Sequence, residues 1–269
     1  MPLEQGHKTL VMGIVNMTPD SFSGDGLNGD DQKALLVAKR FIEEGADIID
    51  IGGESTRPGA SEVSTEEEIR RVIPAIERLS RELDTPVSID TCKPLVASRA
   101  LEAGASMIND VSGLKRDPAL AGVAGRYGAA LVITSNQRDH PCQGDIIAEV
   151  IRDLRESIDL ALRHGVGPWN IIVDPGIGFG KTPQQNIEIL RRLGELKVLE
   201  RPILIGTSRK SFIGRVLDLP PTERLEGTLA TIALAIAQGA DIVRVHDVKE
   251  AVRACRVSDA VIRGERHEG

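Results

Sequence analysis

Aromatic side chains are scarce in this sequence: 2% of its 269 residues, with four phenylalanines, one tryptophan and one tyrosine. A flat ligand therefore cannot depend on a cage of stacked rings, and must be bound largely by polar groups and aliphatic walls. This scarcity gives weight to particular charged residues in any search for a binding site.

Cysteines and long apolar runs are scarce as well. Cys92, Cys142 and Cys255 are odd in number and lack the spacing of metal ligands, so we expect idle thiols in a reduced, cytoplasmic protein without structural disulfides. Every apolar run falls short of the ~20 residues that cross a bilayer. Residues 1–10 lack the apolar core of a signal peptide, and we expect no membrane partner.

Positive charge is in the minority, with 33 Lys and Arg against 40 Asp and Glu and a formal net charge of -7 at pH 7. On balance, such a surface repels the phosphate backbone of nucleic acids. We therefore expect no nucleic-acid partner, and any anionic ligand must meet a local basic site.

The sequence does contain a repeated phrase, in which a helix-like stretch ends in Gly-Ala and leads at once into a short apolar run. Four copies are clear: EEGADIIDIGG from Glu43, EAGASMINDVSG from Glu102, RYGAALVITSN from Arg126 and QGADIVRVHDV from Gln238. Each glycine suits the left-handed cap of a helix, and each apolar run suits a buried strand. The phrase predicts that helix leads to strand each time.

Four further apolar runs bring the predicted strands to eight; they start at Thr9, Pro86, Asn170 and Pro202. The stretches between strands carry helical spacing and charge, with Ser64 or Thr65 as the N-cap of one helix. Apolar strands alternating with amphipathic helices predict a parallel sheet, and eight of them favour a (β/α)8 TIM barrel over an open sheet. We expect a single α/β domain over residues 1–269, with its core at about 9–262.

In such a barrel the active site lies at the carboxyl ends of the strands, so the polar residues that end the apolar runs are candidates. In chain order they are Asn16, Asp50, Asp90, Asn109 with Asp110, Ser135 with Asn136, Asp174, the segment 208–211, and Arg244 with His246. Any one of them alone could simply cap the next helix or turn. Their convergence from every strand predicts a polar site.

Two glycine-containing segments follow predicted strands. GGESTRPG, residues 52–59, has small residues and an arginine that could bind an anion, although it could equally be a flexible loop. DPGIGFGKT, residues 174–182, fits neither the dinucleotide nor the Walker pattern. Nucleotide binding is therefore disfavoured.

Basic residues follow the last two predicted strands. SRKS, residues 208–211, places a guanidinium and an ammonium at the mouth of the barrel. Arg244 and His246 are two residues apart, so strand alternation points both to one side, where they could hold an anionic leaving group. Solvated basic side chains and a structural ion pair of Arg244 are the alternatives.

The chain resembles the dihydropteroate synthases, a family of pterin-binding enzymes, from about Leu10 to Ile262. Seven motifs carry the resemblance, in the family's order: GIVNMTPDSFSGDG, DIGGESTRPGA, SIDTCKP, INDVSGL, DPGIGFGKT, IGTSRKSFIG and ADIVRVHDVKE. The resemblance implies that 7,8-dihydropterin-6-ylmethyl diphosphate is joined to 4-aminobenzoate, releasing diphosphate and forming 7,8-dihydropteroate for folate synthesis. It also implies Mg²⁺ and a homodimer.

By position, the resemblance assigns residues to each part of the substrates. The implied pterin-binding residues are Asp90, Asn109, Asp174 and Lys210, and the implied diphosphate-binding residues are Asn16, Arg244 and His246. Val245 is a further implied substrate-binding residue. In the second loop, the residues implied to contact the substrates are Thr56, Arg57 and Pro58. The residues implied to border the aminobenzoate are Phe179, Lys210 and Ser211. Catalytic roles fall to Asp90, Lys210, Arg244 and His246, and Asn16 is the implied Mg²⁺ ligand.

The chemistry implied by the resemblance is displacement at the pterin methylene through a cation-like centre, with no covalent enzyme intermediate. The glycine-containing loops 18–30 and 53–63 lie beside residues that bind ligand. We expect both loops to close over the site and exclude water.

One departure from the family lies after the fifth predicted strand, where the chain reads ITSNQRDHP. The family usually has Met-His at the positions of Thr134 and Ser135. An apolar wall of the pterin pocket is therefore predicted to become polar. The loss of pterin-binding free energy should not exceed the roughly 1.5–3 kcal/mol that burial of a whole Met side chain contributes. A low-activity or non-catalytic pterin-binding paralogue therefore stays open. A corrinoid-dependent pterin-binding methyltransferase is the other alternative, but methyl transfer does not need the SRKS and Arg244–His246 groups.

Overall fold

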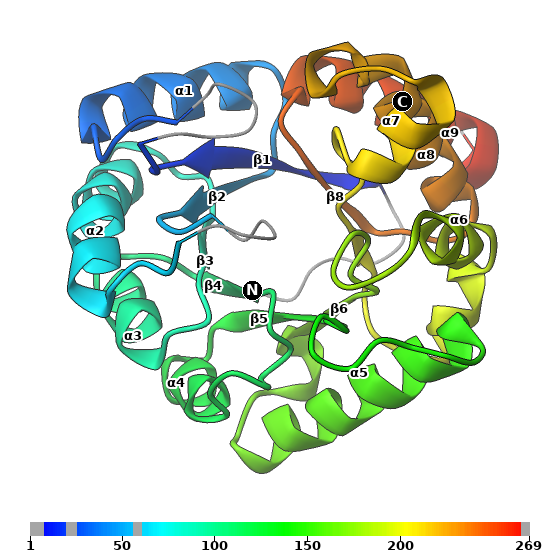
Figure 1. Ribbon diagram of the computed structural model, residues 1–269. Coiled ribbons are helices and arrows are strands. Elements are labelled where there is room, and N and C mark those ends of the chain that lie inside the picture. The colour runs from blue at the N-terminus through cyan, green and yellow to red at the C-terminus, as the bar shows by residue number, and fades with distance from the viewer. Residues whose placement is uncertain (1–7, 20–25, 56–60, 265–269) are drawn as a thin grey trace.

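The computed structural model describes residues 8–19, 26–55 and 61–264, and eight parallel strands in these ranges form its centre (Figure 1). The strands are β1 (Leu10–Asn16), β2 (Ile48–Gly52), β3 (Val87–Asp90), β4 (Met107–Asp110), β5 (Ala130–Thr134), β6 (Ile171–Asp174), β7 (Leu204–Ile205) and β8 (Ile242–Val245). Each lies within one of the eight predicted apolar runs.

The strands curl into a near-closed barrel, with the hydrogen-bonded order β6-β5-β4-β3-β2-β1-β8-β7. One isolated bridge between Val173 and Ile203 joins β6 to the β7 side, and Val173 N–H donates to Pro202 O at 2.9 Å. β7 is shorter than the run predicted from Pro202, because proline has no N–H for the ladder and Ile203 N–H donates to Asp241 Oδ2 at 2.8 Å. The chain is thus a single α/β domain with the predicted TIM-barrel fold.

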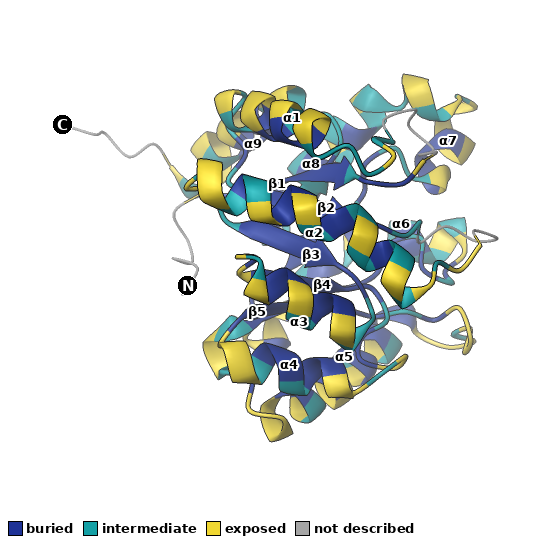
Figure 2. Ribbon diagram, turned by 90° about the vertical axis from the view of Figure 1, so that its left-hand side faces the viewer, coloured by how far each residue is buried: buried dark blue, intermediate teal, exposed yellow. Residues whose placement is uncertain are grey.

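Helices surround the barrel (Figure 1). They are α1 (Asp31–Glu43), α2 (Thr65–Glu82), α3 (Pro94–Glu102), α4 (Ala119–Tyr127), α5 (Ile146–Arg163), α6 (Pro183–Arg191), α7 (Ser211–Leu217), α8 (Leu225–Ala237) and α9 (Val248–Arg263), with short 3-10 turns at η1 (Pro168–Asn170), η2 (Leu193–Leu199) and η3 (Pro221–Glu223). Their buried faces pack on the strands and their exposed faces point outward (Figure 2). Of the two predicted N-caps of α2, Ser64 is the cap: its hydroxyl accepts from Glu67 N–H at 3.2 Å.

The repeated phrase forms the turns that return the chain from helix to strand. Its four glycines all have left-handed backbone conformation, with φ of 103°, 109°, 61° and 100° at Gly45, Gly104, Gly128 and Gly239. Gly104 also allows close packing, because a Cβ there would lie 2.5 Å from Ser80 Cβ on α2. The predicted left-handed caps are confirmed, and they direct each helix into the next buried strand.

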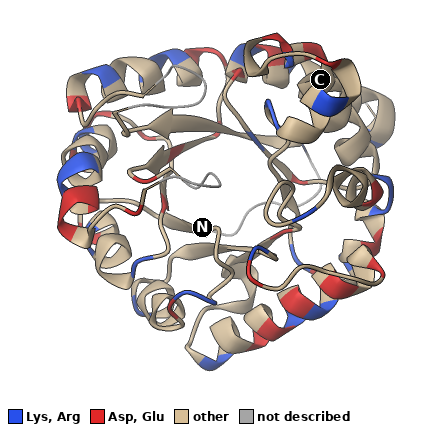
Figure 3. Ribbon diagram, viewed as in Figure 1, with Lys and Arg blue, Asp and Glu red and all other residues tan. Residues whose placement is uncertain are grey.

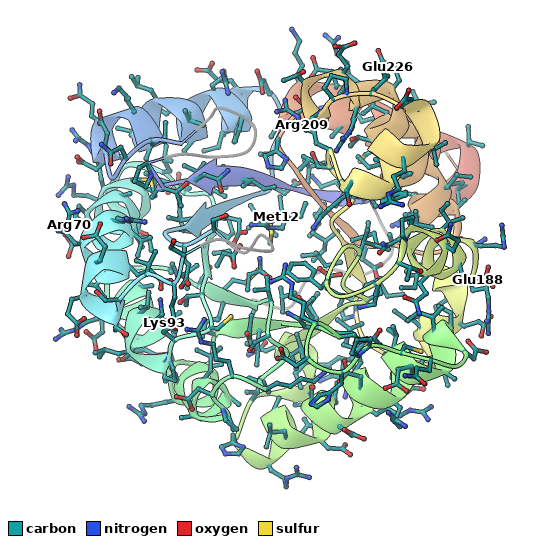
Figure 4. All side chains as sticks on the ribbon, in the orientation of Figure 1. Met12, Arg70, Lys93, Glu188, Arg209 and Glu226 are labelled. Atoms are coloured by element: carbon teal, nitrogen blue, oxygen red, sulfur yellow. The ribbon has the colours of Figure 1, made fainter. Side chains whose placement is uncertain are left out.

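Strand alternation separates the interior of the barrel from its outer wall. The interior holds an apolar cluster, which we call the floor: Leu10, Met12, Ile48, Met107, Ala130, Val132, Ile172, Leu204 and Ile242. Met12 lies near the barrel centre in Figure 4. Two residues further along three of these strands, the inward positions are the buried polar residues Asp50, Asn109 and Asp174. The site therefore lies directly above an apolar floor.

The outer surface carries charges of both signs, spread over the helices (Figure 3). Many form exposed ion pairs within one helix, such as Arg70 with Glu67 at 2.7 Å on α2, and such pairs contribute little to stability. Cys92, Cys142 and Cys255 are free thiols. Within the described ranges, no helix combines the length and apolar character needed to cross a membrane.

Candidate active site

A cavity of about 340 Å³ opens at the carboxyl ends of the strands. Nine of the predicted site residues line it: Asn16, Asp90, Asn109, Asp174, Phe179, Lys210, Ser211, Arg244 and His246. They come from β1, β3, β4, β6, β8, the loops after β6, β7 and β8, and the first residue of α7. Because Arg244 and His246 both reach this cavity, the prediction that alternation points them to one side is confirmed.

Arg244 lies between two buried carboxylates. Its Nε donates to Asp50 Oδ2 at 2.6 Å and its Nη2 donates to Asp90 Oδ2 at 2.7 Å. Asn109 Nδ2 also donates to Asp50 Oδ2, at 3.2 Å. The second oxygens, Asp50 Oδ1 and Asp90 Oδ1, are buried and find no hydrogen-bond partner among the described residues. We call these four residues the acid–arginine cluster. It holds a fixed guanidinium, and of its two carboxylates only that of Asp90 lines the cavity.

Burial dominates the electrostatics of this cluster. It raises the pKa of Asp90 to about 7, with Arg244 opposing the shift and the like charge of Asp50 adding to it. Burial also opposes the charge on Arg244, but the carboxylates of Asp50 and Asp90 outweigh it and raise the pKa of the guanidinium. The arginine therefore stays charged, whereas Asp90 can change its protonation near neutral pH.

Asp174, Phe179 and Lys210 lie on the β6 and β7 side of the cavity. Lys210 Nζ is 4.7 Å from the centre of the Phe179 ring, within the range of a cation–π contact. Asp174 Oδ1 accepts from Gly176 N–H at 2.7 Å. Burial raises the pKa of Asp174 and lowers the pKa of Lys210 to about 8, with the Asp174 carboxylate opposing the latter shift. A carboxyl group and an amine thus face one cavity, the arrangement typical of functional sites.

The SRKS segment links the ends of β7 and β8. Arg209 has a left-handed φ of 56° and pairs with Asp247, with Nε to Oδ2 at 3.0 Å and Nη2 to Oδ1 at 2.5 Å (Figure 4). Ser208 Oγ lies 2.9 Å from His246 Nδ1 and accepts from His246 N–H at 3.2 Å. These contacts hold His246 and the start of α7 in place beside the cavity.

A second cavity of about 540 Å³ adjoins the first, and the residues lining both are Glu54, Ser55, Asp90, Val111 and Arg138. The guanidinium carbon of Arg138 lies 4.8 Å from the centre of the Phe179 ring. Our sequence reasoning missed Arg138, because it lies beyond the strand end in a polar loop. Its contact with the aromatic ring, its place in the wall of both cavities and the burial that lowers its pKa distinguish it from a solvated arginine.

Some predicted site residues do not line the cavity. Val245 belongs to the hydrophobic core cluster outside the barrel, because alternation turns its side chain away from the interior. Its predicted contact with substrate stays a prediction. Thr56, Arg57 and Pro58 lie outside the described residues, as do parts of the loops 18–30 and 53–63 whose closure we expected. Asp50, a strand-end candidate without an assigned ligand, proves central to the acid–arginine cluster.

Thr134 and Ser135, where the chain departs from the family, are both buried and neither lines the cavity. Ser135 Oγ instead donates to Asp153 Oδ2 on α5 at 2.7 Å, so the predicted polar wall is not formed by Ser135. Thr134 is in register with Asp174 on β6, and its hydroxyl has no partner among the described residues. Ser135 therefore contributes to packing behind the site, whereas Thr134 shares the inward phase of Ala130 and Val132 on β5 without lining the cavity.

A metal ion would find few protein ligands in this part of the molecule. The described residues contain no group of three or more His, Cys, Asp and Glu side chains arranged to hold one. Asn16 lines the cavity and carries a carboxamide oxygen. One oxygen ligand suits Mg²⁺, which usually keeps several waters and binds to substrate phosphates rather than to a complete protein cage.

The family of the chain follows from its similarity to known proteins. Residues 12–246 match the family model of the pterin-binding enzymes. The dihydropteroate synthase of Bacillus subtilis is 52% identical over 268 residues, covering 99% of this chain and 94% of that protein. The enzyme of Escherichia coli is 43% identical, covering 94% of this chain and 91% of that protein.

Solved structures of dihydropteroate synthases support the same family assignment. The structure of dihydropteroate synthase from Clostridium difficile, determined in the presence of pteroic acid, matches with a TM-score of 0.93 and 52% identity over 97% of this chain and 99% of that chain. The Xanthomonas albilineans enzyme with 4-aminobenzoic acid matches with a TM-score of 0.88 and 43% identity over 94% and 93%. The chain therefore belongs to the dihydropteroate synthases, pterin-binding transferases of folate biosynthesis.

Proposed function

We propose that this enzyme joins 7,8-dihydropterin-6-ylmethyl diphosphate to 4-aminobenzoate, releasing diphosphate and forming 7,8-dihydropteroate. The observation that carries the proposal is the acid–arginine cluster, with Arg244 held by Asp50 and Asp90 and sharing one cavity with Asp174 and Lys210. Relatives bound to pteroic acid and to 4-aminobenzoic acid support this choice of substrates.

The pterin ring suits the polar groups deep in the cavity. Asp174 can accept paired hydrogen bonds from the ring N–H and exocyclic amine of the aminopyrimidine edge, much as a carboxylate accepts an arginine fork. Lys210 can donate to the ring oxygen or nitrogen, and Asn109 can both donate and accept. Asp90, with one buried oxygen lacking a partner among the described residues, faces the same cavity. Together these groups match a row of adjacent donors and acceptors.

In the proposal, the diphosphate binds to Asn16, Arg244 and His246, which all line the cavity. The guanidinium supplies a fixed positive charge, and Ser208 orients the imidazole through its contact with His246 Nδ1. Asn16 would hold Mg²⁺ through its carboxamide oxygen. When bound there, Mg²⁺ would neutralise part of the diphosphate charge.

In the proposal, the 4-aminobenzoate ring contacts Phe179, Lys210 and Ser211, which line the same cavity. The Ser211 hydroxyl can donate to the substrate carboxylate, and the ammonium beside the Phe179 ring lies in reach of the aromatic acid. Thr56, Arg57 and Pro58 complete this half of the site in the proposal.

The reaction breaks the carbon–oxygen bond at the pterin methylene, and the electron pair leaves with the diphosphate. The arylamine nitrogen then forms the new carbon–nitrogen bond and loses one proton. The carboxylate form of Asp90 stabilises the cationic pterin, while Arg244 and His246 stabilise the charge on the leaving group. Holding the two substrates in one cavity supplies much of the remaining rate enhancement.

Diphosphate release tests the proposed function directly. We expect release only when both substrates are present, and we expect Asp90→Asn, Lys210→Ala and Arg244→Ala each to slow it by about 10²-fold or more. Wild-type rates in all three variants would refute the site assignment. Release with the pterin diphosphate alone would refute the transfer to the arylamine.

We also propose that the enzyme is a cytoplasmic homodimer. Support for a dimer comes from exposed apolar side chains that α7, α8 and α9 present outward: Val216, Leu234, Val257 and Val261. Such side chains on neighbouring helices suit contact with a second copy. Sedimentation of Leu234→Glu against wild type would test this, and an unchanged mass would count against the α8 surface.

A further inference from the structure

A buried lysine joins the two loops that follow β5 and β6. Lys181 is 9% exposed and does not line the cavity. Its Nζ donates to Ser135 O at 2.7 Å and to Phe179 O at 3.3 Å. Both acceptors are main-chain carbonyls, so these bonds fix the backbone of the two loops rather than neutralise a carboxylate.

This contact does not require a charge on the amine. Burial lowers the pKa of Lys181 to about 7, with the carboxylates of Asp174 and Asp153 opposing the shift. The neutral amine still has two N–H groups for the two carbonyls, and the ammonium has three. Lys181 can therefore hold both loops on either side of neutral pH.

The two loops are also in direct contact along their backbones. Gln137 N–H donates to Phe179 O at 3.2 Å. Gly176 and Gly180 each have a left-handed φ of 73°. A Cβ at Gly176 would lie 2.0 Å from Ser135 O, and one at Gly180 would lie 2.3 Å from the carbonyl carbon of Gln137. Such close packing couples the position of one loop to that of the other.

The ring of Phe179 is the part of this contact that reaches the cavity. Its centre lies 4.7 Å from Lys210 Nζ and 4.8 Å from the guanidinium carbon of Arg138. The preceding residue is held separately, because Gly178 N–H donates to Asn186 Oδ1 on α6 at 2.7 Å. Contacts with α6 and with the loop after β5 thus fix the backbone that carries the ring.

Other bonds hold the carboxylate of Asp174. This residue lies on β6, and its carbonyl oxygen accepts from Ser135 N–H at 2.9 Å. Its Oδ1 accepts from Gly176 N–H at 2.7 Å. Neither bond involves the amine of Lys181, so loss of that amine should leave the carboxylate in place.

We infer that Lys181 is a positioning residue for the arylamine half of the reaction, because its amine fixes the backbone of Phe179 against the loop after β5. Under the proposed function, on which this role rests, Phe179 borders the 4-aminobenzoate ring. Without the amine, Ser135 O loses its side-chain donor, while Phe179 O retains the bond from Gln137 N–H. The Phe179 ring is then less ordered, and ordering it on the substrate costs conformational entropy.

Steady-state diphosphate release, with both substrates varied, tests this role together with calorimetric binding of the pterin diphosphate alone. Lys181→Met removes the donors and keeps an unbranched apolar stem. It should raise KM for 4-aminobenzoate by about fivefold, the size expected when one more side chain must be immobilised on binding. The affinity for the pterin diphosphate should stay within about twofold of wild type. An unchanged KM for 4-aminobenzoate, or an equal loss of pterin diphosphate affinity, would overturn the inference.

Two companion variants separate the loss of the donors from general damage. Lys181→Gln matches Lys181→Met in length and keeps two N–H donors, so its KM should lie between those of wild type and Lys181→Met; a KM equal to that of Lys181→Met would contradict the role of the donors. Lys39 pairs with Glu82 at 3.2 Å and its side chain is 46% exposed, so Lys39→Met should match wild type. Circular dichroism checks that each variant is folded. If Lys181→Met is not, Lys181→Gln takes its place under the same two contrary outcomes.

A double-mutant cycle with Phe179→Ala tests whether the amine acts through the ring. Phe179→Ala alone should raise KM for 4-aminobenzoate by about tenfold. Adding Lys181→Met should raise it by less than about twofold further, because the ring to be positioned is already absent. Fully additive effects would refute the action through Phe179. If wild type releases no diphosphate, the proposed function itself fails; an active wild type matched by Lys181→Met refutes only the role of Lys181.

Discussion

The floor and the mouth of the barrel are built on the same strands but are opposite in chemistry. On β8, Ile242 is fully buried in the apolar floor, and Arg244, two residues later, is bonded to Asp50 and Asp90. Both side chains point into the barrel because they share the inward phase of the strand. The contrast indicates that one strand register places apolar side chains in the core at one end of β8 and a charged side chain in the proposed active site at the other.

Removing the mouth cation should give the largest effect. In Arg244→Ala, two buried carboxylates lose their counter-ion, so we expect a loss of diphosphate release of about 10²- to 10³-fold and a fall in the free energy of unfolding of about 3–5 kcal/mol. Initial rates and urea unfolding measure the two effects. Arg244→Lys keeps a cation without the planar fork, so its rate and its free energy of unfolding should lie between those of wild type and Arg244→Ala. Wild-type values for Arg244→Ala would contradict the role of the cluster.

A cavity in the floor should lower the stability of the protein and leave its activity nearly unchanged. Ile242→Ala leaves a cavity among Leu10, Leu204 and their neighbours, and we expect the free energy of unfolding to fall by about 2–5 kcal/mol. Diphosphate release, measured well below the unfolding temperature, should stay within about threefold of wild type, because no floor residue lines the cavity. A large loss of rate in the folded variant would show that floor and mouth are not separable.

The protonation of Asp90, at the mouth of the barrel, should give a smaller effect, which is a dependence of kcat/KM on pH. Burial raises the pKa of this carboxyl to about 7, and the neutral form that dominates below that pH cannot stabilise a cationic pterin. We therefore expect kcat/KM to rise about fivefold between pH 6 and pH 7 in wild type, below the pKa of about 8 at which Lys210 loses its proton. Asp90→Asn should be slow at both values without this inflection. The same inflection in Asp90→Asn would assign it to another group.

Two neighbouring hydroxyls at the end of β5, those of Thr134 and Ser135, should give the smallest effects. Their removal should change the free energy of unfolding in opposite directions. Ser135→Ala removes the hydrogen bond to buried Asp153 and should lower the free energy of unfolding by about 1–3 kcal/mol. Thr134→Val removes a buried hydroxyl without a partner among the described residues and should leave stability equal or raise it by up to about 1 kcal/mol. Thermal unfolding of both measures the difference; destabilisation by Thr134→Val would reveal a contact of that hydroxyl.

Sequence patterns predict the strands and the strand-end candidates well, because alternation and helix caps are local properties. The left-handed glycines and the shared side of Arg244 and His246 follow from such local rules. Val245 was assigned by resemblance, whereas the same alternation rule places it in the outer core. Local rules are thus more dependable when they are applied to every residue of a motif.

Tertiary partners could not be predicted in the same way. Arg244 meets Asp50 and Asp90 only because β2, β3 and β8 curl around one interior. Lys93 reaches Glu54 and Glu68 across three separate elements. The short bridge that closes the barrel depends on the loop before β7. None of these contacts has a periodic signal in the sequence, since each depends on how distant elements pack.

The most direct measurement is single-turnover diphosphate release by Asp90→Asn and Ile242→Ala, with both substrates saturating and both variants shown by circular dichroism to be folded. We expect Asp90→Asn to be slower than wild type by about 10²-fold and Ile242→Ala to remain within about threefold. A fast Asp90→Asn together with a slow Ile242→Ala would contradict the division between a catalytic mouth and a stabilising floor.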